Sequence, residues 1–200
     1  MSHNTWIHRL VTPLVRPLVG TSVSPNQITT LRLGFGLAAA AAYAEGSDIW
    51  LSIGGGFFII SMLLDRADGI LARLSGKLSK FGHYFDLISD SVCNAAIFIG
   101  LGIGLRFTAL GGWTVALGFL AGFAVMFILG VVMWAEGQKG LRAAELPSMA
   151  GFDAEDSTIL IPIIVWLGWG LPLLYVSAAV TPLFAVYFAW LHRRMLRPAA

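Results

Sequence analysis

The sequence DRADGILAR begins at residue 65, and the sequence GHYFDLISD begins at residue 82. Together they contain four aspartates in two pairs: Asp65 and Asp68 are three residues apart, and Asp86 and Asp90 are four apart. At these spacings the two carboxylates of a pair share one face of a helix. The surrounding sequence is strongly apolar, and an ionised carboxylate near the middle of a bilayer costs roughly 2.5–3.5 kcal/mol on insertion scales. Bound divalent metal is the obvious charge to offset this cost, so we expect the function to lie here.

The composition is that of an integral membrane protein. Of the 200 residues, 57% are hydrophobic and 12% are charged, and the mean hydropathy is +0.78. A soluble domain carries roughly 25% charged residues. The single cysteine, Cys93, cannot form an intramolecular disulfide, so an oxidising compartment is not implied. We expect the bilayer to be the surroundings of the chain, and no nucleic acid among its partners.

The apolar pattern predicts an all-α membrane protein with one domain, residues 1–200. Residues 5–19 place their large apolar side chains on one helical face and are interrupted by prolines, which is typical of an amphipathic helix lying in the membrane interface. A bundle of six transmembrane helices is predicted over residues 27–191. The last two are separated by a hairpin near Gly170–Pro172 or Ser177–Pro182. The predicted spans are Gln27–Ala44, Ile49–Arg73, Phe81–Leu105, Trp113–Met133, Thr158–Pro172 and Tyr175–Leu191.

The basic residues predict the orientation of this bundle. With six spans, nearly all of them fall on the side that holds both termini, and only Arg106 falls on the other side. Because cytoplasmic loops carry the excess of lysine and arginine, both termini and the aspartates are predicted to face the cytoplasm, in a bacterial inner (plasma) membrane. The residues on that side are Arg9, Arg16, Arg32, Arg66, Arg73, Lys77, Lys80, Lys139, Arg142, Arg193, Arg194 and Arg197.

The segment from Asp65 to Asp90 matches every fixed position of the pattern D-x2-D-G-x2-A-R-x8-G-x3-D-x3-D. This is the signature of the CDP-alcohol phosphotransferase family, which the chain therefore resembles. Pro25–Thr29, at the start of the first span, is similar to the family's usual entry, and six spans after an interfacial helix is its usual layout. The resemblance implies an enzyme of phospholipid synthesis that is commonly a homodimer.

The aspartates suit the chemistry of a pyrophosphate-linked donor. Hard divalent cations such as Mg²⁺ or Mn²⁺ prefer carboxylate oxygens, and two of them can bridge a pyrophosphate and stabilise the leaving phosphate. We expect Asp65, Asp68 and Asp86 to be the main ligands of two such ions. Asp90 is expected to share a metal and to take the proton from the attacking hydroxyl. The family resemblance implies the same division of roles.

The other fixed positions indicate a nucleotide site. Gly69 and Gly82 lack a Cβ and allow close approach, Ala72 keeps the same wall shallow, and Arg73 offers a fork of donors to phosphate oxygens. The resemblance implies that this strip, with Asp68, holds the cytidine nucleotide, helped by a polar group of the first span. The candidates for that group are Asn26 and Thr29, with Thr30 a weaker one.

The predicted reaction is transfer of a phosphatidyl group from CDP-diacylglycerol (CDP-DAG) to a small alcohol, with release of CMP. Two alternatives remain open. In the first, a soluble CDP-alcohol gives its phosphoalcohol to diacylglycerol or another lipid acceptor, and the same signature serves that chemistry. In the second, a divalent-cation transporter uses the carboxylates as a transit site, although such a site predicts intramembrane acids on several spans.

The sequence gives conflicting signals about the acceptor and an ambiguous one about assembly. Lys139 and Arg142 are candidates to bind a phosphorylated acceptor, or they are ordinary cytoplasmic charge. An acidic group before the fifth span favours an amine, or simply caps the next helix. Gly118-x3-Gly122 is a candidate dimer contact, with helix packing inside one chain as the alternative. The acidic group consists of Asp153, Glu155 and Asp156.

Overall fold

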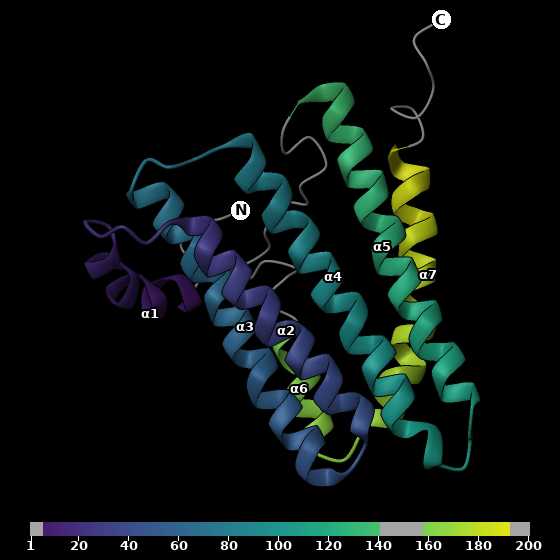
Figure 1. Cartoon of the computed structure of the whole chain (residues 1–200). Coiled ribbons are helices and arrows are strands. Elements are labelled where there is room, and N and C mark those ends of the chain that lie inside the picture. The colour runs from purple at the N-terminus through teal and green to yellow at the C-terminus, as the bar shows by residue number, and fades with distance from the viewer. Residues whose placement is uncertain (1–5, 141–157, 193–200) are drawn as a thin grey trace, which may run out of the picture.

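The computed structural model describes residues 6–140 and 158–192, and every regular element within them is helical (Figure 1). The predicted all-α class is therefore confirmed for this part of the chain. Two short 3-10 helices, Arg16–Leu18 and Leu105–Phe107, supplement the α-helices. The α-helices are α1 Trp6–Val15, α2 Pro25–Glu45, α3 Asp48–Leu74, α4 Lys80–Gly104, α5 Trp113–Lys139, α6 Leu160–Trp166 and α7 Gly170–His192.

Local sequence determines where α2 begins and ends. Ser24 and Gln27 form a capping box: the Ser24 hydroxyl accepts from the Gln27 amide at 3.3 Å, and the Gln27 side chain accepts from the Ser24 amide at 2.9 Å. Pro25 occupies the first turn, where its missing N–H is not needed. The helix ends at Gly46, whose φ of +92° is left-handed. The chain then reverses into α3, so α2 and α3 lie antiparallel (Figure 1).

Glycines bring α4 into close contact with the helices on either side. A Cβ at Gly100 or Gly104 would collide with backbone carbonyls of α2, and a Cβ at Gly118 of α5 would lie 2.5 Å from the Phe98 carbonyl oxygen of α4. A Cβ at Gly122 would lie 3.0 Å from the Ala95 carbonyl oxygen of α4. Gly118-x3-Gly122 thus packs inside the chain, as the second interpretation of this motif expected. The result is a row of helices α3, α2, α4 and α5, in which α2 and α4 run parallel and the other neighbouring pairs run antiparallel, with α7 beside α5 (Figure 1).

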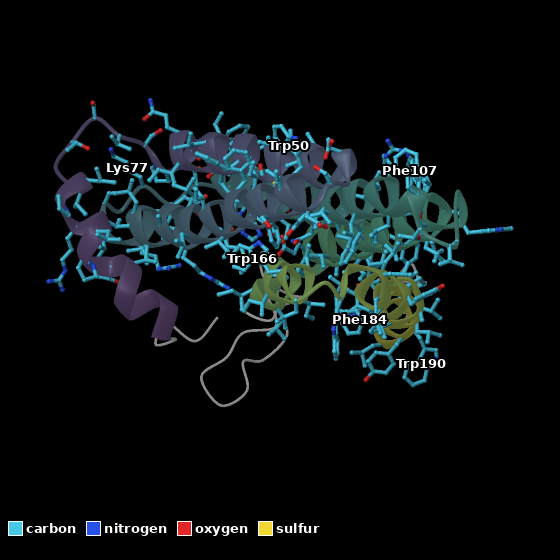
Figure 2. The ribbon with its side chains drawn as sticks, turned by 90° about the horizontal axis from the view of Figure 1, so that it is seen from below. Trp50, Lys77, Phe107, Trp166, Phe184 and Trp190 are labelled. Atoms are coloured by element: carbon cyan, nitrogen blue, oxygen red, sulfur yellow. The ribbon has the colours of Figure 1, made fainter. Side chains whose placement is uncertain are left out.

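Within residues 6–140 and 158–192, four helices are long and apolar enough to cross a membrane. Large apolar side chains remain exposed on them, such as Phe123 of α5 at 67% and Leu183 of α7 at 71%. Figure 2 shows Phe184 and Trp190 projecting from the outer surface of α7. An exposed apolar surface of this extent suits lipid better than water. The four segments are Asp48–Leu74, Lys80–Phe107, Trp113–Gln138 and Gly170–His192, and the count of six spans stays a prediction.

The helices after residue 157 differ from the predicted fifth and sixth spans. α6 has seven residues, about 10 Å at a rise of roughly 1.5 Å per residue, and α7 begins at Gly170 instead of Tyr175. The chain turns at 167–169, where Gly168 has a φ of +78°, so the alternative hairpin at Ser177–Pro182 is wrong. Helix α7 runs through Pro182 without a break. Pro172 lies in the first turn, where a missing N–H costs little.

The N-terminal segment forms α1 and the short 3-10 helix, close to the predicted range 5–19. α1 lies crosswise to the long helices, against the end of α3 (Figure 1). Val11 and Val15 are buried there in a cluster that includes Ile28 of α2 and Leu71 of α3, whereas Leu14 is 75% exposed. An exposed leucine beside a buried face is compatible with a helix at the membrane surface, and that location stays a prediction.

Candidate active site

Carboxylates from α3 and α4 converge at one end of the bundle. One oxygen from each of Asp65, Asp68 and Asp86 can be chosen so that all three lie within 4.8 Å of one another. Asp68 is buried, with 3% of its surface exposed, while the side chains of Asp86 and Asp90 are 39% and 43% exposed. The two helical pairs predicted from the spacing therefore approach each other beside α2, which packs against both α3 and α4.

A short connection brings the two pairs together. Residues 75–79 join α3 to α4, and Gly76 has a φ of +67° that reverses the chain direction. Ser79 then caps α4, and its hydroxyl accepts from the Gly82 amide at 2.9 Å. The tight turn and the cap set where α4 begins after α3, and the packing of both helices on α2 brings Asp86 close to Asp65.

Thr29 of α2 touches the most buried aspartate. Its hydroxyl donates to Asp68 Oδ2 at 2.7 Å, and both side chains are buried. The bond orients one carboxylate oxygen of Asp68. Thr29 was predicted as a nucleotide residue, and in the structure it contacts Asp68 of the predicted metal-ligand set. Thr30 is exposed and donates to the Asn26 carbonyl of its own helix at 2.9 Å, so it does not belong to the cluster.

Arg32, one turn further along α2, contacts both pairs of aspartates. Its guanidinium donates to Asp65 Oδ1, to Asp86 Oδ1 at 2.9 Å and to the Asp86 carbonyl oxygen at 3.2 Å. Asp90 Oδ1 lies 3.8 Å away, and the Arg32 side chain is only 1% exposed. Arg32 was predicted only as one of the basic residues that indicate orientation. A basic residue three positions after Thr29, and so on the same helix face, is the signal that could have identified it.

The predicted nucleotide strip lies beside the carboxylates. The Arg73 guanidinium lies over Gly69, with both terminal nitrogens 3.5 Å from where a Cβ would be. A Cβ on Gly82 would lie 3.2 Å from Asn26 Oδ1, so Asn26 of α2 and Gly82 of α4 are neighbours. Ala72 is half-buried in the same part of α3. The structure thus places Gly69 beside Arg73 of its own helix and Gly82 beside Asn26 of α2.

A small cavity of about 30 Å³ opens on the inner side of the cluster. Asp90 lines it together with Asn94, whose amide donates to Asp90 Oδ1 at 3.1 Å. Arg66, buried on α3, and Thr158 also line it. None of these three neighbours of Asp90 was predicted as a site residue. Asn94 follows Asp90 by four residues, and this helical spacing was the available signal.

The residues predicted to bind the acceptor are not placed by the structure. Lys139 is the last residue of α5, and its side chain lies outside the described part of the chain. Arg142 and the acidic group at 153–156 lie outside the described residues. His83, in the variable part of the signature, pairs instead with buried Glu136 of α5, with Nε2 and Oε2 2.9 Å apart.

The donor set fits a pair of hard divalent cations. The cluster offers only carboxylate oxygens from the four aspartates, without a thiolate or imidazole among the three that converge. Mg²⁺ and Mn²⁺ prefer such ligands. Arg32 brings one positive charge to four carboxylates, so negative charge remains in the cluster for divalent ions to offset.

Comparison with known proteins gives the same assignment as the signature. The model of the CDP-alcohol phosphatidyltransferase family matches residues 22–191. Archaetidylinositol phosphate synthase of Pyrococcus horikoshii is 33% identical over 92 residues, which are 44% of this chain and 46% of that protein. Phosphatidylinositol phosphate synthase of Streptomyces avermitilis is 33% identical over 96 residues, 48% of this chain and 38% of that protein. The matched regions therefore span less than half of each relative.

The fold is also that of a solved structure. Phosphatidylinositol phosphate synthase of Mycobacterium tuberculosis, crystallised with CDP-DAG bound, superposes with a TM-score of 0.68 at 22% identity, covering 91% of this chain and 94% of that one. A second structure of the same enzyme contains manganese and citrate and gives the same score, covering 90% and 88%. The family model spans most of the chain, and its signature aspartates converge in the structure. The chain belongs to the CDP-alcohol phosphatidyltransferase family.

Proposed function

We propose that this protein transfers a phosphatidyl group from CDP-DAG to a small alcohol and releases CMP. The observation that carries the proposal is the convergence of Asp65, Asp68 and Asp86, from the two halves of the family signature, within 4.8 Å. The CDP-DAG in the structural neighbour supports the choice of donor.

Four aspartates would hold two divalent ions: Asp65, Asp68, Asp86 and Asp90. Bound there, the ions would neutralise the donor pyrophosphate and stabilise the phosphate that leaves. The manganese in the structural neighbour and the all-oxygen donor set support Mg²⁺ or Mn²⁺ as the metal.

The strip around Gly69 and Gly82 would hold the cytidine nucleotide. Arg73 offers paired N–H donors beside Gly69, a geometry suited to phosphate oxygens. Asn26 Oδ1 lies beside Gly82, where it can accept from an amino group such as that of cytosine. Asp68, Ala72 and Thr29 complete the same surface, with Thr29 acting by holding Asp68.

Asp90 is the proposed general base. It accepts from Asn94 through Oδ1, which orients its carboxylate, and it borders the cavity in which an acceptor hydroxyl can approach. The hydroxyl oxygen would form a bond to the lipid-side phosphorus while the bond from that phosphorus to the CMP oxygen breaks. The hydroxyl proton would go to the Asp90 carboxylate.

Inositol phosphate is the acceptor that we propose to test first. Both sequence relatives are named for inositol phosphate lipids. Arg32 and Arg66 line the cavity beside Asp90, and arginine side chains are suited to donating to phosphate oxygens of an acceptor. Lys139 and Arg142 remain proposed contributors from the segment after α5.

We propose one membrane domain, residues 1–200, with an interfacial helix at 5–19, six spans over 27–191 and a homodimeric assembly. Lys77 lies at the aspartate end of the α3–α4 pair, and Phe107, next to Arg106, lies at the opposite end (Figure 2). This distribution of basic residues supports a cytoplasmic location of the site and both termini in an inner (plasma) membrane.

The test is CMP release by purified protein, with CDP-DAG or CDP-choline as donor. Acceptors are inositol phosphate, inositol, glycerol 3-phosphate, serine and choline, each with Mn²⁺ or Mg²⁺. The proposal expects CMP only from CDP-DAG, and fastest with inositol phosphate. CMP from CDP-choline and diacylglycerol would establish the reversed donor. Metal flux into liposomes without nucleotide would favour the transporter, although all four aspartates lie on two helices that are consecutive in the chain.

A further inference from the structure

Arg32 uses the same carboxylate oxygens that a metal ion would need. Its Nη1 donates to Oδ1 of both Asp65 and Asp86, and Asp86 Oδ1 is 2.9 Å away. Asp65 and Asp86 also belong to the trio whose oxygens converge for metal binding. One guanidinium nitrogen thus lies between two of the three aspartates that the signature assigns to metal.

The surroundings hold the guanidinium in this position. The Arg32 side chain is 1% exposed, its Nη2 donates to the Asp86 carbonyl oxygen at 3.2 Å, and the Ser61 hydroxyl of α3 donates to the Arg32 carbonyl oxygen at 3.0 Å. A buried charge is costly unless it is paired, so Arg32 and the aspartates stabilise one another. The arginine therefore supplies positive charge to the cluster from within the chain.

A divalent ion and this guanidinium cannot both bind the same carboxylate oxygens closely. Mg²⁺ binds carboxylate oxygen at about 2.0–2.1 Å. An ion at that distance from Asp65 and Asp86 would lie close to Arg32 Nη1, where the two positive charges repel strongly at low dielectric constant.

We propose that Arg32 competes with the divalent cations for Asp65 and Asp86 and thereby sets the metal affinity of the site. The proposal rests on the metal site of the proposed function and is independent of which donor and acceptor react. The guanidinium gives up its bonds to these carboxylates when metal ions take them.

The test measures Mn²⁺ binding in detergent without nucleotide, by electron paramagnetic resonance titration. Arg32→Gln is expected to bind Mn²⁺ at least tenfold more tightly than the natural protein. The midpoint of thermal unfolding of Arg32→Gln in EDTA is expected to be lower than that of the natural protein. Adding Mn²⁺ is expected to raise this midpoint by more in the variant than in the natural protein. Arg106→Gln is the matched control: it removes one arginine that donates to the Ala44 and Ile103 carbonyl oxygens, at 3.0 and 2.7 Å, near the opposite end of the bundle. It is expected to leave the Mn²⁺ dissociation constant unchanged.

An Arg32→Gln protein that binds Mn²⁺ no more tightly than the natural protein would overturn the proposal. If this variant does not fold, structures of the natural protein with Mn²⁺ and with EDTA decide. The proposal expects Arg32 to donate to Asp65 and Asp86 only in the EDTA structure. It would be refuted if Arg32 kept its bonds to both carboxylates while they also bind Mn²⁺. CMP release failing while the Arg32 results hold would count against the proposed function alone.

Discussion

Thr29→Val removes one hydrogen bond from the centre of the site with little change in side-chain volume. The Thr29 hydroxyl donates to Asp68 Oδ2 at 2.7 Å, and both groups are buried. A hydrogen bond to a charged group contributes roughly 1.5–3 kcal/mol net. At 1.36 kcal/mol per factor of ten, this corresponds to a loss of roughly tenfold to 150-fold, which is the upper limit because the variant also lacks the bond before metal binds.

The loss is expected to appear in how CMP release depends on Mn²⁺ concentration. Asp68 without its donor is less well oriented, so Thr29→Val should need more Mn²⁺ for half-maximal CMP release and should release CMP more slowly below saturation. The assay is CMP release from CDP-DAG across a Mn²⁺ titration. Thr30→Val is the matched control, because the Thr30 hydroxyl donates to the Asn26 carbonyl of its own helix on an exposed face. Equal Mn²⁺ dependence of Thr29→Val and the natural protein would refute this account of Asp68.

The remaining predictions concern packing, metal and capping. Gly118→Ala places a Cβ 2.5 Å from the Phe98 carbonyl oxygen, so thermal unfolding in detergent should show a loss of about 1–3 kcal/mol, whereas Gly130→Ala, with no atom within 4 Å, should show none. EDTA should abolish CMP release and added Mn²⁺ should restore it; persistent release in EDTA would remove the metal from the mechanism. Ser79→Ala should lower the free energy of unfolding by about 0.5–2 kcal/mol through loss of the α4 cap, and an unchanged unfolding curve would show that the cap contributes nothing.

The aspartate cluster could be predicted from sequence because helical geometry determines it. Spacings of three and four place each pair on one face, and the two helices are joined by only five residues, 75–79. The convergence of Asp65, Asp68 and Asp86 required only that these faces meet.

Arg32 could not be recognised in the same way. A basic residue near the end of an apolar span is usual at a cytoplasmic surface, and only the packing of α2 against α3 and α4 shows that this one is buried among carboxylates. The turn at 167–169 lies beside one of the two predicted hairpin sites, Gly170–Pro172, and the sequence could not choose between the sites because the residues around both are apolar. Gly118-x3-Gly122 predicted close packing, but the sequence contains no information on which helix is the partner.

The central claim is that the converging aspartates carry out the CDP-linked transfer. Its most direct test compares CMP release from CDP-DAG by the natural protein and by Asp86→Asn, at saturating Mn²⁺ and with the acceptor panel. Asparagine keeps the shape of the side chain and removes the charge that metal binding needs. The account predicts CMP from the natural protein and none above background from the variant. CMP release by Asp86→Asn at the natural rate would contradict it.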